Sequence, residues 1–404
     1  MISVEEALAR LLAPLKPLPP EQISIVDGLG RVLAEDVAAR RTQPPFAVSA
    51  MDGYAVRADD VKTVPVELRI VAEVPAGAGF GGDVGPGETA RIFTGAPLPA
   101  GTDTIVIQEE TQRQGDRVRV MEGALRGRYV RREGLDFAEG QVLLPAKRRL
   151  TARDIGLLAA MNRPWLLVHR RPRIGILSTG DEIVMPGDPI GPHQIVSSNS
   201  LALAAFVSAC GGIPISVGNA PDDPEALRRI AAATRGVDLL VTTGGASVGE
   251  HDLVRDALAA DGLELDFWQI AMRPGKPLMV GRYRGTPMVG LPGNPVSTLV
   301  CALLFLRPAL DRLGGAASAE EATPTARLGV AMRQNDRRQD YLRARLARVA
   351  DGTLEAFPFE VQDSSMMRLL AMADCLVVRP PHAPALAAGA TVPIVPFPAG
   401  VLPF

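Results

Sequence analysis

One glycine-rich segment has the residue types of an anion-binding turn. Residues 237–252 read VDLLVTTGGASVGEHD, an apolar run that predicts a buried strand, then a glycine-rich turn and the start of a helix. At the carboxyl end of a parallel strand, such a turn presents unpaired backbone N–H groups and a helix dipole to a ligand. The segment therefore predicts an anion site, although the glycines could serve only to make a tight turn. Its candidate contacts are Thr243, Gly244, Gly245, Ser247 and Gly249.

A second predicted strand ends in two carboxylates. Residues 174–182 read IGILSTGDE, an apolar run followed by small residues and by Asp181 and Glu182. Carboxylates at a strand end can bind Mg²⁺ or orient hydroxyl groups. They can equally cap the following turn, so this segment by itself leaves both interpretations open.

Cations and helix N-termini occur in two turns rich in proline and glycine. Arg273 and Lys276 lie in RPGKP, and a rigid turn presents such charges to an oxyanion at a small entropic cost. In GLPGNPVS, Asn294 and Ser297 begin a predicted helix whose N-terminus adds N–H donors. A solvated charge pair is the alternative for the two cations. If these strands form one sheet, the turns converge on a pocket for a phosphate-bearing or otherwise oxyanionic small molecule.

The surrounding pattern predicts an α/β domain over about residues 171–314. Apolar strand patterns alternate there with helix patterns, which is typical of a doubly wound, mostly parallel sheet. The predicted strands and helices are, in order, 173–178, 199–209, 214–218, 224–233, 237–242, 252–260, 278–281, 288–290 and 295–313.

Three further parts are predicted around this domain. Residues 1–42, which have a helical pattern, and residues 138–170 are assigned to an N-terminal helical and linker domain. Residues 43–137 contain short β-rich runs, at 66–74, 104–108 and 117–120, between glycine and proline clusters, and predict an inserted β-rich domain. Residues 318–404 contain a hairpin turn at Asp351-Gly352 and predict a small β-barrel or sandwich.

Composition excludes several classes of partner. The 43 Lys and Arg residues balance 45 acidic residues, so the chain has no overall field for a nucleic-acid backbone. Its three cysteines, Cys210, Cys301 and Cys375, lie far apart in apolar segments, as core thiols of a reducing compartment do. No apolar run reaches the roughly 18 residues of a membrane helix, and the N-terminus is not patterned as a signal peptide. We expect a cytoplasmic protein with no nucleic-acid or membrane partner.

Seven strings of the sequence together resemble the molybdopterin molybdenumtransferase family, that is, MoeA and the E domain of gephyrin-type proteins. The resemblance spans essentially the whole chain. The glycine-rich string alone is shared with molybdopterin adenylyltransferases and CinA-like proteins, whereas the N-terminal and proline-rich strings distinguish this family. In chain order the strings are SAMDGYAVR, RIFTGAPLPAG, RREGLDFAEG, STGDE, VTTGGASVGEHD, RPGKP and GLPGNPVS.

The resemblance implies the last step of molybdenum cofactor synthesis. Adenylylated molybdopterin and molybdate would be converted to molybdenum cofactor and AMP, with Mg²⁺ as the divalent cation. The resemblance also implies a homodimer of elongated four-domain subunits, whose active cleft lies between the α/β domain of one subunit and the β insert of the other. Contact with the upstream molybdopterin adenylyltransferase is inferred from the pathway only.

The resemblance also assigns site residues. The family's functional acids and threonine fall on Asp52, Thr94, Asp136, Glu182, Asp222 and Asp252, with Glu182 and Asp252 as the expected metal ligands. Its oxyanion-binding positions fall on Arg273, Lys276, Ser297, Arg343 and Ser364.

Three positions depart from the family pattern. Gln269 stands where lysine is frequent, Arg273 replaces the usual lysine, and residues 196–199 read VSSN instead of Tyr-Asp-Ser/Thr-Asn. The missing lysine at position 269 would weaken the affinity for an oxyanion. Arg273 keeps the positive charge, and its planar guanidinium can donate two parallel hydrogen bonds.

Two other functions compete with this hypothesis. An adenylyltransferase that uses the same glycine-rich motif would consume ATP, but that activity leaves both β-rich domains unexplained. A gephyrin-like scaffold would bind its partners without the acids. The acids and cations gathered at predicted strand ends favour an enzyme.

Overall fold

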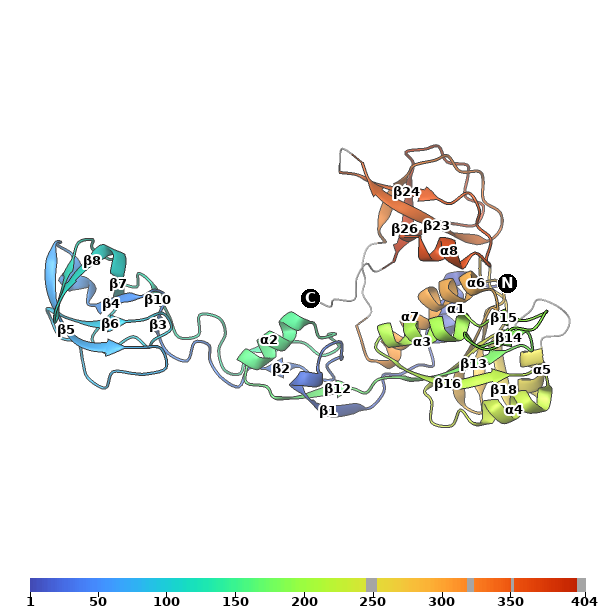
Figure 1. The fold of residues 1–404 in the computed structure, drawn as a ribbon, viewed down its shortest axis with the longest axis horizontal. Helices are drawn as coiled ribbons and strands as arrows, with labels where there is room; N and C mark the ends of the chain where they lie inside the picture. The colour runs from blue at the N-terminus through green and yellow to red at the C-terminus, as the bar shows by residue number, and fades with distance from the viewer. Residues whose placement is uncertain (245–252, 318–322, 350–351, 398–404) are drawn as a thin grey trace.

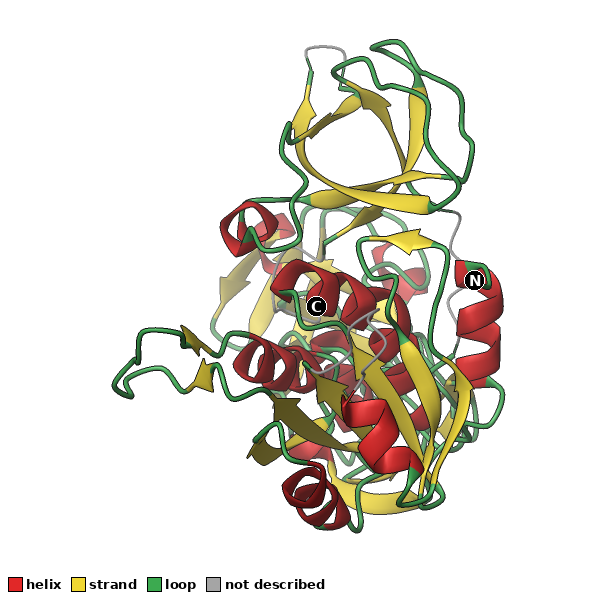
Figure 2. Ribbon diagram, turned by 90° about the vertical axis from the view of Figure 1, so that its right-hand side faces the viewer, coloured by secondary structure: helices red, strands yellow, loops and turns green. Residues whose placement is uncertain are grey.

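The computed structural model describes residues 1–244, 253–317, 323–349 and 352–397. They form an elongated molecule with a β-rich insert at one end, a small middle unit, and an α/β part at the other end (Figure 1). A barrel formed by the C-terminal residues lies beside the α/β part, at the top of Figure 2. The predicted fold class is confirmed, and the insert lies well away from the α/β part.

A six-stranded sheet forms the centre of the α/β part. Its order is β16-β13-β17-β21-β20-β18, in which the first four strands are parallel and β20 is antiparallel to both of its neighbours. The central strands are almost completely buried because both faces of the sheet are covered. The strands are β13 (Arg173–Thr179), β16 (Ile213–Ala220), β17 (Leu239–Thr243), β18 (Leu263–Phe267), β20 (Met279–Tyr283) and β21 (Thr286–Leu291).

Helices pack on both faces of this sheet, as the doubly wound pattern predicts. Ile176 of β13 shares a core with Leu203 and Leu310, while the next residue, Leu177, points into a second core with Leu227. None of the described helices is both long and apolar enough to cross a membrane. The helices are α3 (Asn199–Ala209), α4 (Pro224–Ala232), α5 (Leu253–Ala259), α6 (Pro295–Cys301), the π-helical η4 (Ala302–Leu306) and α7 (Arg307–Leu313).

The N-terminal helix is shorter than its pattern predicts. α1 spans Val4–Leu12 and packs through Ala7 and Leu11 into the core of the α/β part. The helical prediction is wrong from there to residue 42, because the prolines at 14, 17, 19 and 20 lack the N–H group that a helix interior needs. The chain instead forms β1 (Pro20–Ser24), the 3₁₀ helix η1 (Ile25–Asp27) and β2 (Val37–Ala38).

The middle unit combines residues from both sides of the insert. β1 pairs with β12 (Trp165–His169), and β2 pairs with β11 (Val142–Leu144), both antiparallel. α2 (Ala152–Ala160) begins after its N-cap Thr151, which forms a capping box with Asp154. The unit has its own small apolar core.

The insert is built on a second six-stranded sheet of order β7-β4-β6-β5-β9-β8, accompanied by a short β3–β10 pair. The three strands predicted for this region are present. The elements are β3 (Val48–Ser49), β4 (Gly53–Val56), η2 (Ala58–Val61), β5 (Val66–Val74), β6 (Glu88–Ile92), β7 (Thr104–Ile107), η3 (Gln108–Glu110), β8 (Thr111–Gln114), β9 (Arg117–Val120) and β10 (Val130–Arg131).

The C-terminal residues form a closed five-stranded barrel. Its strands follow the order β23-β24-β22-β26-β25, and β25 pairs back onto β23 to close the ring. β19 (Met272–Arg273) of the α/β part also pairs with β23, so the two parts share hydrogen-bonded strands. The elements are β22 (Thr325–Leu328), β23 (Gln339–Arg348), β24 (Leu354–Pro358), α8 (Met367–Ala371), β25 (Cys375–Arg379) and β26 (Thr391–Pro396).

Candidate active site

The turns after three parallel strands of the α/β sheet touch one another. Gly244, directly after β17, has a φ of 90°, and a Cβ there would overlap the carbonyl oxygen of Thr179 at the end of β13. A Cβ on Gly293, after β21, would lie 3.6 Å from the Cα of Gly244. Glycine at position 244 therefore lets the β13 and β17 ends meet, as the sequence predicts for neighbouring parallel strands.

Asn199, the first residue of α3, holds two of these strand ends together. Its Nδ2 donates to Thr243 Oγ1 at 3.0 Å and to the Gly293 carbonyl at 2.7 Å. The amide thus links β17 to the turn after β21. The sequence places Asn199 at the start of a predicted helix and within the VSSN departure, but Asn199 was not predicted as a site residue.

An open cleft of about 680 Å³ lies over the joined strand ends. Residues from the β13 end, the start of α3, the β17 and β21 ends, and the segment before α8 line it. They include Ser178, Thr179, Glu182, Asn199, Thr243, Gly244, Asn294, Ser297 and Ser365.

Two residues that line this cleft carry buried hydroxyl groups without a partner. Ser178 and Thr179 are 5% and 2% exposed, and their hydroxyls have no hydrogen bond within the described part of the chain. A buried polar atom left unsatisfied costs stability, so such atoms often mark ligand sites. Neither hydroxyl was singled out from the sequence, although both lie in the quoted STGDE string.

Arg343 of β23 lies beside the cleft as a buried guanidinium. It is 1% exposed, and it donates to Gln362 Oε1 at 3.2 Å and to the Met366 carbonyl at 3.3 Å. Burial lowers the pKa of Arg343, and the charge of Asp363 opposes that shift although no ion pair joins the two side chains within the described residues. Met366 stands between Ser365 and Met367, which both line the cleft. A buried cation that lacks an ion pair suits an anionic ligand.

The segment that holds Arg343 is docked on the N-terminus of α6. Ser364 Oγ accepts a hydrogen bond from Asn294 Nδ2 at 2.8 Å, and the Ser364 carbonyl accepts one from the Val296 N–H at 3.0 Å. Ser297 is buried in the same helix turn. The predicted positions Asn294, Ser297, Arg343 and Ser364 therefore lie together.

The two cations of RPGKP differ in their surroundings. Lys276 is half-buried, precedes the cleft residue Pro277, and has no side-chain partner among the described residues. Arg273 is instead ion-paired with Asp340 and with Asp336, the latter at 3.2 Å. Its charge is thus already matched by two carboxylates. Like Lys276 and Arg343, it is not among the residues that line the cleft.

The predicted acids of the α/β part occupy different positions. Glu182 is exposed and lines the cleft. Asp222 is exposed, and its backbone N–H donates to Asp181 Oδ1 at 3.1 Å, which places it beside the STGDE turn. Asp252, Gly245, Ser247 and Gly249 lie outside the described residues.

A magnesium ion fits the donor chemistry near Glu182. Mg²⁺ is usually held through one or two carboxylates together with substrate phosphates and water. Among the described residues there is no group of three or more His, Cys, Asp or Glu side chains that could hold a metal by themselves. One cleft carboxylate therefore suits a metal that arrives with phosphate groups.

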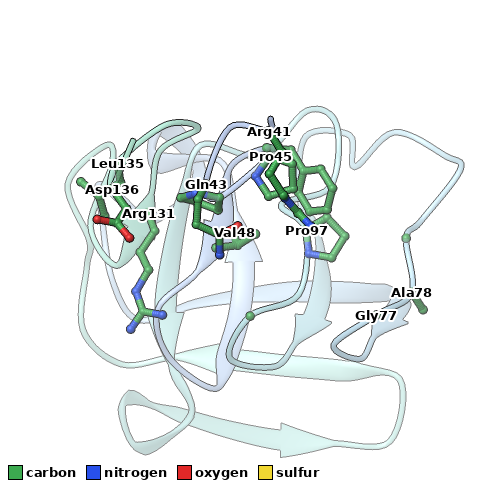
Figure 3. Close-up of a pocket in the computed structure, with 14 residues that line it drawn as sticks. Arg41, Gln43, Pro45, Val48, Gly77, Ala78, Pro97, Arg131, Leu135 and Asp136 are labelled. Atoms are coloured by element: carbon green, nitrogen blue, oxygen red, sulfur yellow. The ribbon is translucent and has the colours of Figure 1, made fainter. Parts of the chain in front are cut away.

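The remaining predicted residues lie at the other end of the molecule, in and beside the insert. Asp52 Oδ1 accepts hydrogen bonds from the Thr94 N–H at 2.7 Å and from the Thr94 hydroxyl at 2.8 Å. These two bonds, the backbone one most, hold the pKa of Asp52 below its ordinary value. Asp136 lines a second cavity of about 720 Å³, with Arg131 on its side and Arg41 farther across (Figure 3). Gly95, next to Thr94, also lines this cavity.

Three family models cover most of the chain. The MoeA N-terminal region (domain I and II) matches residues 2–162, the probable molybdopterin binding domain matches 175–312, and the MoeA C-terminal region (domain IV) matches 325–397. A molybdopterin molybdenumtransferase of Haemophilus influenzae is 30% identical over 401 residues, which cover 98% of this chain and 99% of that protein. The chain belongs to the molybdopterin molybdenumtransferase family.

Other family members and solved structures agree. A molybdopterin molybdenumtransferase of a Nostoc species is 43% identical over 300 residues, 72% of this chain and 69% of that protein. Two crystal structures of the molybdopterin biosynthesis MoeA protein from Pyrococcus horikoshii match with TM-scores of 0.83 and 0.84 and identities of 32% and 26%. They cover 99% and 98% of this chain and 100% of each of those chains. As a molybdenumtransferase, this family member is an enzyme of molybdenum cofactor biosynthesis.

Proposed function

We propose that this enzyme inserts molybdenum from molybdate into adenylylated molybdopterin, with Mg²⁺-dependent release of AMP. The observation that carries the proposal is the single cleft formed by the β13, β17 and β21 ends, beside a buried and unpaired guanidinium. The turns after these strands can bind phosphate through their backbone N–H groups, and the guanidinium of Arg343 can bind an oxyanion. Both therefore lie at the same cleft.

Molybdate binds at the barrel side of the cleft in this proposal. It is a tetrahedral dianion, and Arg343 is a buried cation with no carboxylate in contact. Lys276 supplies a second charge, while Ser297, Ser364 and Asn294 supply hydroxyl and amide groups at the α6 N-terminus. Arg273 holds the turn that carries Lys276 rather than the oxyanion itself, because Asp340 and Asp336 already pair with it.

The phosphates of the adenylylated substrate lie over the β13 and β17 ends. Thr243 and Gly244, at the start of the glycine-rich turn, line the cleft together with Ser178 and Thr179. The sequence also assigns Gly245, Ser247 and Gly249 to this turn. These groups orient the phosphoanhydride between the two halves of the substrate.

Glu182 and Asp252 would hold Mg²⁺ in this proposal. When bound, the ion supplies positive charge that neutralises the phosphates of the leaving AMP. The protein's thiols are not used as nucleophiles, because burial raises the pKa of all three cysteines, that of Cys210 to about 11 and that of Cys375 to about 12. Protonated thiols of this kind are poor nucleophiles at neutral pH.

The enzyme works as a homodimer whose sites are shared between subunits. The insert, which contains Asp52, Thr94 and Asp136, lies at the opposite end of the subunit from the α/β part (Figure 1). A second copy can bring its insert, with these residues, to the cleft of the first. Two shared sites per dimer follow from twofold symmetry. The protein's free thiols suit the reducing cytoplasm, and contact with the adenylyltransferase stays a prediction.

AMP release tests this function directly. Purified protein given adenylylated molybdopterin, Mg²⁺ and molybdate should release AMP, and omission of molybdate should greatly reduce the yield of molybdenum cofactor. Glu182→Gln should lose most of the release. Consumption of ATP with unmodified molybdopterin, independent of molybdate, would instead identify an adenylyltransferase.

A further inference from the structure

A hydrogen-bonded network in the insert surrounds the predicted site residues Asp52 and Thr94. Asp52 directly precedes β4, and Thr94 lies in the turn after β6, the neighbouring strand of the insert sheet. The two bonds from Thr94 to the Asp52 carboxylate therefore depend on how these ends of β4 and β6 lie relative to each other. Arg91, near the end of β6, bonds to this part of β4.

The guanidinium of Arg91 is held by two aromatic rings and two acceptors. Tyr54 is its direct partner in the β4–β6 register. The Arg91 Cζ atom lies 5.1 Å from the centre of the Tyr54 ring and 5.0 Å from that of the Phe93 ring, where ring faces attract a cation. Nη1 donates to the Gly53 carbonyl at 3.2 Å, and Nη2 donates to Gln108 Oε1 at 2.6 Å. These contacts fix the side chain in one orientation.

The same contacts hold the backbone that carries the Asp52 carboxylate. The Gln108 N–H donates to the Asp52 carbonyl at 3.1 Å. Arg91 bonds to the Gln108 side chain and to the carbonyl of the next residue, Gly53. A Cβ on Gly53 would overlap the Val106 carbonyl oxygen, so β4 lies close against β7 there. Loss of Arg91 would release the Gly53 carbonyl and the Gln108 side chain together.

Arg91 leaves the Asp52 carboxylate open to a ligand. The pKa of Asp52 is lowered first by the two bonds from Thr94 and more weakly by the positive charge of Arg91. Among the described residues, no ion pair joins Arg91 to a carboxylate, and Asp52 Oδ2 accepts no hydrogen bond, because both Thr94 donors bind Oδ1. Arg91 therefore supports Asp52 without occupying the oxygen that a ligand would meet.

We propose that Arg91 is a positioning residue of the shared active site, which holds the Asp52–Thr94 pair in the orientation that meets the partner's cleft. This inference rests on the proposed function, which brings the insert of one subunit to the cleft of the other. Arg91 acts through Asp52 and not on the substrate, because its guanidinium is already bound to groups of the insert. Placement matters because a displacement of about 1 Å can cost about 100-fold in rate.

A cycle of variants of the full-length protein tests this role through the kcat for AMP release. Arg91→Met removes the guanidinium at similar length and should lower kcat about tenfold. In the Asp52→Ala background, where the carboxylate is already absent, the same substitution should cause less than about a twofold further loss. Arg69→Met is the matched control, because Arg69 is ion-paired with Glu88 at the other end of β6. Its kcat should equal that of wild type.

A second variant separates position from charge. Gln108→Leu removes an acceptor of the Arg91 guanidinium but no charge, and it keeps the backbone N–H that bonds to Asp52. Weaker bonds from Thr94 raise the pKa of Asp52, so carboxyl NMR titration without substrate should show a higher pKa in Gln108→Leu and in Arg91→Met. Gln112→Leu, at an exposed position of β8, is the matched control and should leave this pKa unchanged. Because Gln108 is exposed, its variant should fold even if Arg91→Met does not.

The outcomes distinguish this proposal from the proposed function. Equal losses of kcat from Arg91→Met with and without the Asp52 side chain would overturn the positioning role, as would an unchanged pKa of Asp52 in Gln108→Leu. If wild type forms molybdenum cofactor while Arg91→Met changes neither kcat nor the pKa of Asp52, only the positioning role fails. If both variants raise the pKa of Asp52 while wild type forms no molybdenum cofactor, the proposed function fails and the hold of Arg91 on Asp52 remains.

Discussion

The guanidinium of Arg273 is ion-paired with the buried carboxylate of Asp340. Arg273 belongs to β19 of the α/β part and Asp340 to β23 of the barrel, and the two residues are direct partners in the strand register. Burial raises the pKa of Asp340, and Arg273 opposes that shift. The pair thus joins the two parts at the turn that carries Lys276, on the strand that also carries Arg343.

Loss of Arg273 should destabilise the protein more than loss of an ordinary surface arginine. Arg273→Ala leaves Asp340 buried without its cation, and we expect a loss of about 2 kcal/mol because the arginine itself is half-exposed. Urea denaturation measures the effect, with Arg282→Ala as the exposed control. The double variant Arg273→Ala/Asp340→Ala should lose less than the sum of the single variants. Simple additivity would show that the pair does not couple.

Arg343→Met should separate oxyanion binding from folding. The substitution removes a buried charge at similar length but also the donors to Gln362 Oε1 and the Met366 carbonyl, so the free energy of unfolding should fall by no more than about 2 kcal/mol. The KM for molybdate should rise by at least about tenfold because a charge-assisted contact is lost. Arg345→Ala, an exposed arginine two residues farther along β23, is the control. An unchanged KM in Arg343→Met would remove Arg343 from the oxyanion site.

Gly244→Ala should cost more than the same change at Gly236. Both glycines have positive φ values, 90° and 84°, so alanine at either position costs about 1 kcal/mol from backbone strain. At Gly236 a Cβ would meet nothing within 4 Å, whereas at Gly244 it would overlap the Thr179 carbonyl oxygen. We therefore expect greater destabilisation and loss of AMP release only in Gly244→Ala. Equal stability losses would argue against close contact of the strand ends.

Thr94→Val should raise the pKa of Asp52. The variant removes the hydroxyl donor but keeps the backbone N–H, so the pKa moves only part of the way to its ordinary value. A depressed pKa stabilises the fold above the ordinary pKa of aspartate, and that gain is lost as pH falls through the lower value. Asp52 is exposed enough that we expect the clearer effect in activity, whose acid limit should move to higher pH. Carboxyl NMR titration checks the shift, and an unchanged pKa contradicts it.

Shared sites predict complementation between two inactive variants. An Asp136→Ala subunit has an intact cleft, and a Glu182→Gln subunit has an intact insert. Each variant alone should be inactive, but in a mixed dimer one of the two sites receives both intact halves. Random pairing of equal amounts should restore about a quarter of wild-type activity. No recovery, with mixed dimers verified by affinity tags, would place both residues in the same subunit's site.

The sequence by itself determined the local elements and the family. The alternation of strand and helix patterns predicted the α/β sheet, and turn residues predicted the C-terminal hairpin, because side-chain periodicity and turn chemistry act over a few residues. The seven strings identified the family before any contact was known. The helical prediction for residues 1–42 is wrong beyond α1, because closely spaced prolines end the helix there.

Tertiary structure alone decided which groups meet and which are already paired. Asn199 reaches Thr243 and Gly293 only because the strand order places β17 beside β21. Arg343 and Arg273 are both arginines near an anion motif, yet one is buried without an ion pair and the other is neutralised by Asp340. Such partners come from strands that are remote in sequence. The spacing of residues along the chain does not show whether a side chain is buried or which residue lies beside it on the neighbouring strand.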